Sequence, residues 1–258
     1  MASRSRFRWK KRTERPLSYV PHQRRWDLDG VLPAAPLSAP TVPARSLAPG
    51  DEARVWQDLT AEYDARLLQA ELVRRAPGFS PELELFLEAW AEDEAKHAAA
   101  LTRLYMEASG ATQEGVRARL DGRSGDFEPM ASFLDDEFRL SVLLAYDEAM
   151  STHGYGADIP FYASLGGTPE RQAAFAAVLR ALKNDEAVHY RNAVELLACR
   201  HQGRAGEIAP LMDEIVALDA GQSEYKATFL LDHANDQFDE PGMRRVASAV
   251  VRTLERRL

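Results

Sequence analysis

The sequence predicts an all-α protein, a bundle of four long helices with additional C-terminal helices and an extended N-terminal arm. From residue 51 onward Ala, Leu, Glu and Arg predominate, and no segment alternates apolar and polar residues with the period of a strand. Gly and Pro pairs divide this part into long helical stretches. Prolines recur from Pro16 to Pro49 and disfavour long helices there. We therefore expect an arm over 1–49 and a helical domain over 50–258.

Composition excludes several classes of protein. The chain has 258 residues, of which 45% are hydrophobic, so it is long enough for one large domain or two small ones. Charged residues interrupt every apolar stretch and the N-terminus lacks the apolar segment of a secretory signal, so we expect a cytoplasmic protein that does not span a membrane. The single cysteine, Cys199, excludes an intramolecular disulfide and a cysteine-based metal cluster. Any metal would then be held by histidines and carboxylates.

Charge is unevenly distributed along the chain. The first 25 residues contain nine basic residues and one acid, a net charge of +8, so the rest of the chain carries −16 of the total of −8. A solvated tail, an organelle transit sequence and a docking element for an acidic partner all fit such a segment. The basic residues that would bind a partner are Arg4, Arg6, Arg8, Lys10, Lys11 and Arg12. RNA would satisfy the same charge, although we expect no nucleic-acid function.

The first two long helices form an antiparallel hairpin. The first is predicted over 51–76 and is stopped by Pro77-Gly78. The second is predicted over 80–109, because Ser80-Pro81-Glu82 combines an N-cap, a proline and an acid in the first turn. The short connection places the two helices side by side.

The second half of the domain repeats this arrangement. After a short helix over 113–120, a long apolar pattern predicts a helix over 129–165, bent or broken between Gly154 and Pro160. Thr168-Pro169-Glu170 begins the fourth long helix, over 168–201. Three further helices are predicted over 207–219, 223–234 and 241–257.

Two Glu-x-x-His motifs carry the chemistry. They are Glu94 with His97 and Glu186 with His189, one on each of two long helices. Residues three apart share a helix face, so each motif presents a carboxylate and an imidazole to the same point. One such pair is weak evidence, but a carboxylate-bridged pair of metals in a four-helix bundle also needs a Glu at the same height on each of the other two helices.

The helix ends locate those two glutamates. Glu62 and Glu94 both lie 14 residues from the first hairpin turn, or about 21 Å at 1.5 Å per residue. Glu71 lies about 13 Å away from that level. Glu148 and Glu186 both lie 17 residues from the second turn, whereas Glu137 is about 16 Å from their level.

Six candidate ligands result, four carboxylates and two imidazoles. They are Glu62, Glu94, His97, Glu148, Glu186 and His189. Such a set of oxygen and nitrogen ligands favours a pair of iron ions, or of manganese ions, over a structural zinc.

This ligand pattern resembles that of the ferritin-like diiron carboxylate superfamily. The residues around the ligands are most similar to those of the soluble acyl-carrier-protein desaturases. The motifs read Glu92-Asp93-Glu94-Ala95-Lys96-His97 and Asn184-Asp185-Glu186-Ala187-Val188-His189. Glu148 is followed by Ser151 and by Thr152-His153-Gly154, similar to the threonine and Ser-His-Gly of that family, with a His-Gly spacing two residues shorter. The resemblance covers roughly residues 55–197.

The resemblance implies further roles. Metal-bound histidines usually donate their second N–H to a carboxylate, which makes Asp185 the candidate partner of His97 and Asp93 that of His189. Ser151 or Thr152 would donate a hydrogen bond or proton near bound oxygen. The implied activity is O₂-dependent desaturation or hydroxylation of an acyl-type substrate, carried by an acidic acyl carrier protein that the basic arm would dock. An external electron donor of the ferredoxin type and a homodimer are also implied.

Two alternatives remain open at this stage. A ferritin-like protein that oxidises and handles iron would use the same ligands without an organic substrate. A metal-free helical interaction protein would leave four acidic side chains on helix faces, where charged residues are usually exposed. If the four are buried, they need a cation.

Overall fold

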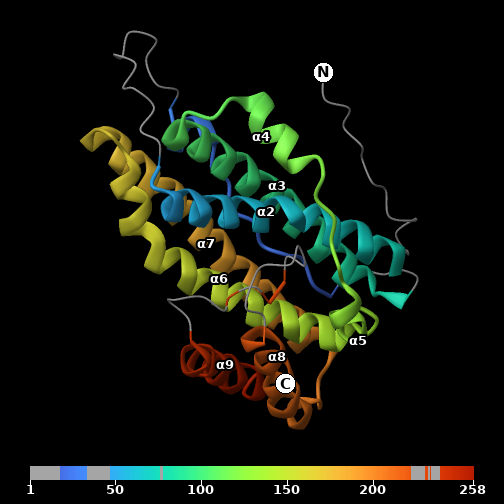
Figure 1. The fold of residues 1–258 in the computed structure, drawn as a ribbon. Coiled ribbons are helices and arrows are strands. Elements are labelled where there is room, and N and C mark those ends of the chain that lie inside the picture. Colours follow the sequence, from blue (N-terminus) through green and yellow to red (C-terminus); the bar gives the residue numbers. More distant parts are fainter. Residues whose placement is uncertain (1–17, 34–46, 76–77, 222–229, 232, 234–238) are drawn as a thin grey trace.

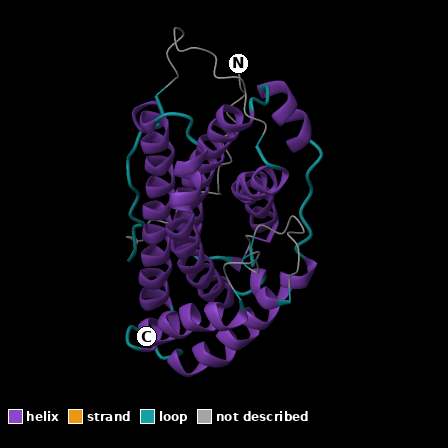
Figure 2. Cartoon of the chain, turned by 60° about the vertical axis from the view of Figure 1, so that its left-hand side comes forward, coloured by secondary structure: helices purple, strands orange, loops and turns teal. Residues whose placement is uncertain are grey.

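The computed structural model describes residues 18–33, 47–75, 78–221, 230–231, 233 and 239–258, and every regular element among them is a helix (Figures 1 and 2). Four long helices form the bundle, as predicted. They are α2 (Pro49–Arg75), α3 (Pro81–Ser109), α6 (Glu137–Leu165) and α7 (Pro169–Arg200). None of the described helices is long and apolar enough to cross a membrane.

The bundle consists of two antiparallel hairpins, α2 with α3 and α6 with α7 (Figure 1). Both predicted N-caps form. The Ser80 hydroxyl accepts a hydrogen bond from the Leu83 N–H, and the Thr168 hydroxyl accepts one from the Arg171 N–H. Because both hairpins have short connections, residues equally far from a turn lie at the same height on the two helices of each hairpin.

The predicted long helix over 129–165 is wrong at its start. A 3₁₀ turn (Glu128–Met130) and the short helix α5 (Ala131–Leu134) precede α6, which begins only at Glu137. Asp136 is the N-cap, and its side chain accepts a hydrogen bond from the Arg139 N–H. Because the apolar pattern continues through α5, hydrophobic periodicity does not indicate the interruption between α5 and α6.

Of the bend or break predicted between Gly154 and Pro160, the break is wrong. Helix α6 continues through both residues to Leu165. A proline within a helix removes one backbone hydrogen bond, and here packing against α7 and α2 outweighs that loss.

The accessory helices lie against the bundle. Helix α4 (Gln113–Leu120) matches its prediction, while α8 (Ile208–Ala220) and α9 (Glu240–Glu255) pack on each other and on α6 (Figure 1). Most of the predicted helix over 223–234 lies outside the described residues. Leu230, Leu231 and His233, which are described, are not helical, and Leu231 has a positive φ of 58°.

The buried apolar residues form two separate clusters along the bundle. On α3, the first cluster ends at Trp90 and the second begins at Ala100. On α7, the second cluster ends at Leu182 and the first begins at Ala193. A layer of polar residues therefore crosses the bundle between two apolar cores, and it contains both Glu-x-x-His motifs.

The described part of the arm packs on the outside of α3 and α7. The His22 N–H donates to the Asn192 side chain at 2.9 Å, and the Asn192 amide donates to the His22 carbonyl at 2.7 Å. A short helix, α1 (Leu28–Val31), follows and contacts α7. The six basic residues predicted to bind a partner lie outside the described residues.

Candidate metal centre

The six predicted ligands come together at the centre of the polar layer. Their side chains form two groups that share two members. Glu62, Glu94, His97 and Glu186 form one group, and Glu94, Glu148, Glu186 and His189 form the other. All six residues are buried, with exposed fractions of 6% or less. Each of the four bundle helices contributes at least one of them.

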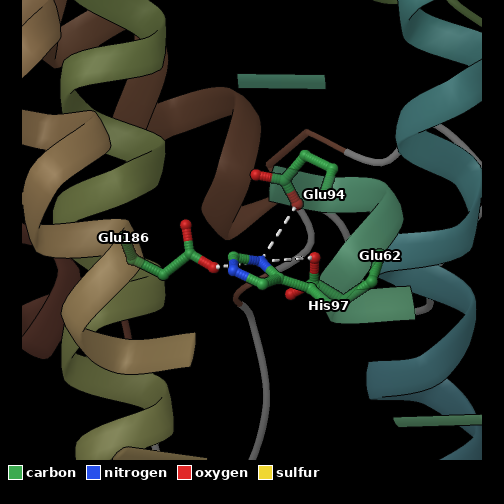
Figure 3. A group of neighbouring side chains, drawn as sticks. All are labelled: Glu62, Glu94, His97 and Glu186. Atoms are coloured by element: carbon green, nitrogen blue, oxygen red, sulfur yellow. Dashed lines mark ion pairs between the residues drawn. The ribbon is translucent and has the colours of Figure 1, made fainter. Parts of the chain in front are cut away.

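The first group surrounds the Nδ1 atom of His97 (Figure 3). This nitrogen lies 3.1 Å from a Glu186 oxygen, 3.4 Å from a Glu62 oxygen and 3.6 Å from a Glu94 oxygen. In Figure 3 the Glu186 side chain reaches across from α7 towards the imidazole, while Glu62 and Glu94 approach from α2 and α3. Three carboxylates thus converge on one imidazole nitrogen.

The second group repeats this geometry around the Nδ1 atom of His189. That nitrogen lies 3.0 Å from Glu186, 3.2 Å from Glu148 and 3.3 Å from Glu94. Glu94 and Glu186 use opposite carboxylate oxygens in the two groups: Oε2 and Oε1 face His97, and Oε1 and Oε2 face His189. The two imidazole centroids are 5.9 Å apart. Glu94 and Glu186 therefore belong to both groups. One further carboxylate and one imidazole complete each group.

Each histidine has an aspartate behind it. The Nε2 atom of His97 lies 3.2 Å from Asp185, and that of His189 lies 3.3 Å from Asp93. Each aspartate therefore comes from the other Glu-x-x-His helix, as the resemblance implied. Lys96 joins the two, with its Nζ atom 2.8 Å from Asp93 and 3.6 Å from Asp185.

Three aromatic residues that the sequence reasoning did not assign to the site also contact it. The Tyr155 hydroxyl donates to Glu62, the Trp90 indole N–H donates to Glu148 at 2.8 Å, and the Trp26 indole N–H donates to Asp185 at 2.6 Å. Tyr155 lies two turns after Glu148 on α6, so helical spacing offered a signal. Trp26 belongs to the arm, and no local pattern places it here.

The other residues considered from the sequence are not members of the two groups. The Thr152 hydroxyl donates to the Glu148 carbonyl at 2.8 Å, and both Ser151 and Thr152 are partly buried on α6. Glu71 binds Arg74 and Arg75, away from the cluster. Glu137 accepts hydrogen bonds from the Ser80 N–H and hydroxyl, at 2.7 and 2.8 Å.

Burial and crowding of charge shift the ionisation of this cluster. Burial, reinforced by the adjacent Glu94 carboxylate, raises the pKa of Glu62 well above its usual range. Burial alone would lower the pKa of His97, but the surrounding carboxylates, Glu186 foremost, raise it well above its usual value. The pKa of His189 is raised for the same reason, with Glu148 foremost. In the absence of cations, protons therefore compensate for the buried negative charge.

The arrangement fits a pair of divalent metal ions. Within the described part of the chain, Oε2 of Glu62 and Nδ1 of His97 are buried without a hydrogen-bond partner, although they face each other across 3.4 Å. Such atoms are costly unless something binds them. Two divalent cations would balance four carboxylates, and the mixed oxygen and nitrogen donors suit iron or manganese.

A family model supplies independent information about this region. The model for rubrerythrin matches residues 57–197, more than half of the chain. The chain belongs to the rubrerythrin family. The matched segment contains all six clustered residues, and no curated protein or solved structure is significantly similar to the chain.

Membership of the rubrerythrin family confirms the predicted ferritin-like diiron superfamily and gives no support to a closer similarity to acyl-carrier-protein desaturases. Family and buried cluster together identify an iron-binding protein of the diiron type.

Proposed function

We propose that this rubrerythrin-family protein is a non-haem diiron oxidase or oxygenase that uses O₂ and an external electron donor to hydroxylate or desaturate an apolar, acyl-type substrate. The observation that carries the proposal is the pair of buried carboxylate and imidazole groups that share Glu94 and Glu186. Two bound ferrous ions would supply electrons for the reduction of O₂. We assign Glu62 and His97 to one iron, Glu148 and His189 to the other, and the two shared glutamates to both.

Side chains around the cluster hold these ligands in place. Asp185 and Asp93 accept hydrogen bonds from the imidazoles and so fix which ring nitrogen faces the cluster. The Tyr155 hydroxyl and the Trp90 indole N–H each restrain one terminal carboxylate. Apolar cores on both sides of the layer exclude water, which protects a strong oxidant from side reactions.

Two reactions, hydroxylation and desaturation, are compatible with O₂ as the oxidant and balance in atoms and electrons. Hydroxylation inserts one oxygen atom of O₂ into a C–H bond and reduces the other to water, with two electrons and two protons from outside. Desaturation removes two hydrogen atoms from the substrate and reduces O₂ to two waters, again with two external electrons and two protons. Both need a reductant, and we propose a ferredoxin-type protein, since no dinucleotide-binding glycine motif occurs in the sequence.

Formation of an oxidised organic product tests this function. The iron-loaded protein is mixed with a chemical or ferredoxin reductant, O₂ and acyl chains, either free or attached to an acyl carrier protein, and the products are analysed by mass spectrometry. We expect an added oxygen atom or a loss of two hydrogen atoms, abolished in Glu94→Ala and Glu186→Ala and retained in Glu71→Ala.

Iron uptake distinguishes the oxidase from an iron-handling protein that uses the same ligands. An oxidase retains about two irons per chain and stops, whereas a protein that oxidises iron for storage continues to take up Fe(II) in the presence of O₂. Continued uptake without any organic product would contradict the proposed function.

A further inference from the structure

A groove on the outer side of α2 and α3 leads to the candidate metal centre. Its volume is about 620 Å³, which lies in the usual range for small-molecule sites. Glu62 of α2 and Glu94 of α3 both line it. The groove therefore connects two proposed metal ligands with the surface.

The wall on α3 is made of small apolar side chains. Ala91, Ala95, Ala98 and Ala99 line the groove on either side of Glu94, and the wall continues through Thr102 to Met106. Because alanine side chains are short, they leave the space beside Glu94 unfilled. They offer an apolar strip of about eight residues between Glu94 and Thr102, or roughly 12 Å of helix.

Glu62, which lines the groove, is a buried residue. Within the described residues, Oε2 of Glu62 has no hydrogen-bond partner, and the Glu62 residue is only 6% exposed. The groove is thus lined by a residue that we propose as a ligand of the centre and whose buried carboxylate has one oxygen without a hydrogen-bond partner among the described residues.

One cation at the groove has no acidic partner among the described residues. Arg66 lines the groove one turn from Glu62, is exposed, and stacks its guanidinium on the Tyr63 ring at 4.3 Å. Arg103, the other arginine in the lining, is already neutralised, because it pairs with Asp29 at 2.6 Å and with Glu107 at 3.5 Å. Stacking on Tyr63 restrains the Arg66 guanidinium beside the groove, where it can bind an anion.

We propose that this groove binds an apolar molecule with a single anionic group, which pairs with Arg66 while the apolar body lies along the alanine face of α3. This deepens the proposed function, since it assigns a charge and a shape to the substrate of the same site. It also orients the substrate, because the anion is held within about one helical turn of Glu62.

Three probes of equal chain length and different charge test the proposal. Calorimetric titration of the iron-loaded protein compares decanoate, decanol and decyltrimethylammonium. We expect decanoate to bind best and the cation least. Arg66→Gln should weaken decanoate binding roughly tenfold and leave decanol unchanged, because a charge-assisted hydrogen bond in a partly desolvated groove has about that effect. Arg252→Gln, which removes an exposed arginine of α9, is the matched control.

A second variant tests the location. Ala99→Phe places a large side chain in the groove and should abolish binding of all three probes, whereas Ala249→Phe, on an exposed face of α9, should not. Iron content is measured on the same samples and should stay at about two per chain in every variant. Equal affinity for decanoate and decanol, or an unchanged affinity in Arg66→Gln, would overturn the proposal while the iron content keeps the proposed function intact. A protein without iron would instead refute the proposed function.

Discussion

Glu94 and Glu186 each direct one carboxylate oxygen to His97 and the other to His189. The chemistry of the site depends on this sharing of two carboxylates between two imidazoles. A single cation would need only one of the two groups. Four buried carboxylates lie around two imidazoles, and two divalent cations would balance their charge. The six side chains therefore form two linked sets that share two glutamates.

Removal of a terminal glutamate tests the ligand assignment. We expect Glu62→Ala and Glu148→Ala to weaken iron binding by more than tenfold, because each removes a charged ligand from one side of the centre. Glu71→Ala is the matched control on α2, since Glu71 pairs with Arg74 and Arg75 at the helix end. Iron content after dialysis against a chelator provides the measurement. Full retention in Glu62→Ala would show that this carboxylate is not a ligand.

The aspartates behind the histidines should matter almost as much. We predict that Asp93→Asn and Asp185→Asn lower iron affinity about 10–100-fold, because each weakens the hydrogen bond that orients an imidazole. Competition with a chromogenic chelator measures this change. Asp121→Asn, at an exposed position after α4, should bind iron like the parent protein. An affinity equal to the parent's in both variants would mean that the imidazoles are held by other contacts.

Much of this constellation could be predicted from residue spacing. Helix punctuation placed Glu62 beside Glu94 and Glu148 beside Glu186, and the four do meet. Trp26 could not be found in this way, because its contact with Asp185 joins residues 159 apart in sequence. Long-range contacts of this kind depend on how the arm packs, which local patterns do not encode.

Among the elements, one junction joins the ends of three bundle helices. Glu137, the first residue of α6, accepts from Ser80, the N-cap of α3, and lies 3.5 and 3.6 Å from Arg200 and His201 at the end of α7. This carboxylate thus ties three helix ends together. The sequence reasoning excluded Glu137 as a ligand by its height but did not foresee the junction, because the start of α6 was misplaced.

The ionisation of Glu137 predicts a pH dependence of stability. Burial alone would raise its pKa, but the contacts with His201, Ser80 and Arg200 outweigh burial and lower it. A lowered pKa in the folded state stabilises the protein above the unfolded value and loses this effect as the pH falls through the folded one. We expect Glu137→Gln to cost about 1 kcal/mol at pH 7 and progressively less towards pH 3. Denaturant unfolding measures the difference, with the exposed Glu128→Gln as control. A cost that is constant with pH would refute this.

The turn between α6 and α7 requires a glycine at one position. A Cβ atom at Gly166 would lie 2.4 Å from the Gln172 backbone nitrogen, whereas one at Gly167 would meet nothing within 4 Å. Gly166→Ala should therefore lower the free energy of unfolding by about 1–3 kcal/mol, while Gly167→Ala should change it little. Thermal unfolding of the two variants provides the comparison. Equal melting temperatures would mean that the turn adjusts without cost.

On the scale of the whole molecule, the bundle is two apolar cores separated by one polar layer. The fold class followed from composition and punctuation, because helix-forming residues and capping signals agree along the chain. The division into two cores could not be predicted from composition and helix-end signals, since it depends on how the apolar faces of different helices pack together. Residues 26–258 carry an excess of acidic residues. Four of their carboxylates lie in the polar layer, where two divalent ions would neutralise them.

The number of bound irons and their positions decide whether the polar layer is a diiron centre. The purified chain is loaded anaerobically with Fe(II), freed of excess metal, and analysed for iron per chain and by anomalous diffraction at the iron edge. The account predicts two irons per chain, one beside His97 and one beside His189, each in contact with Glu94 and Glu186. No bound iron, a single iron, or iron bound outside this layer would contradict it.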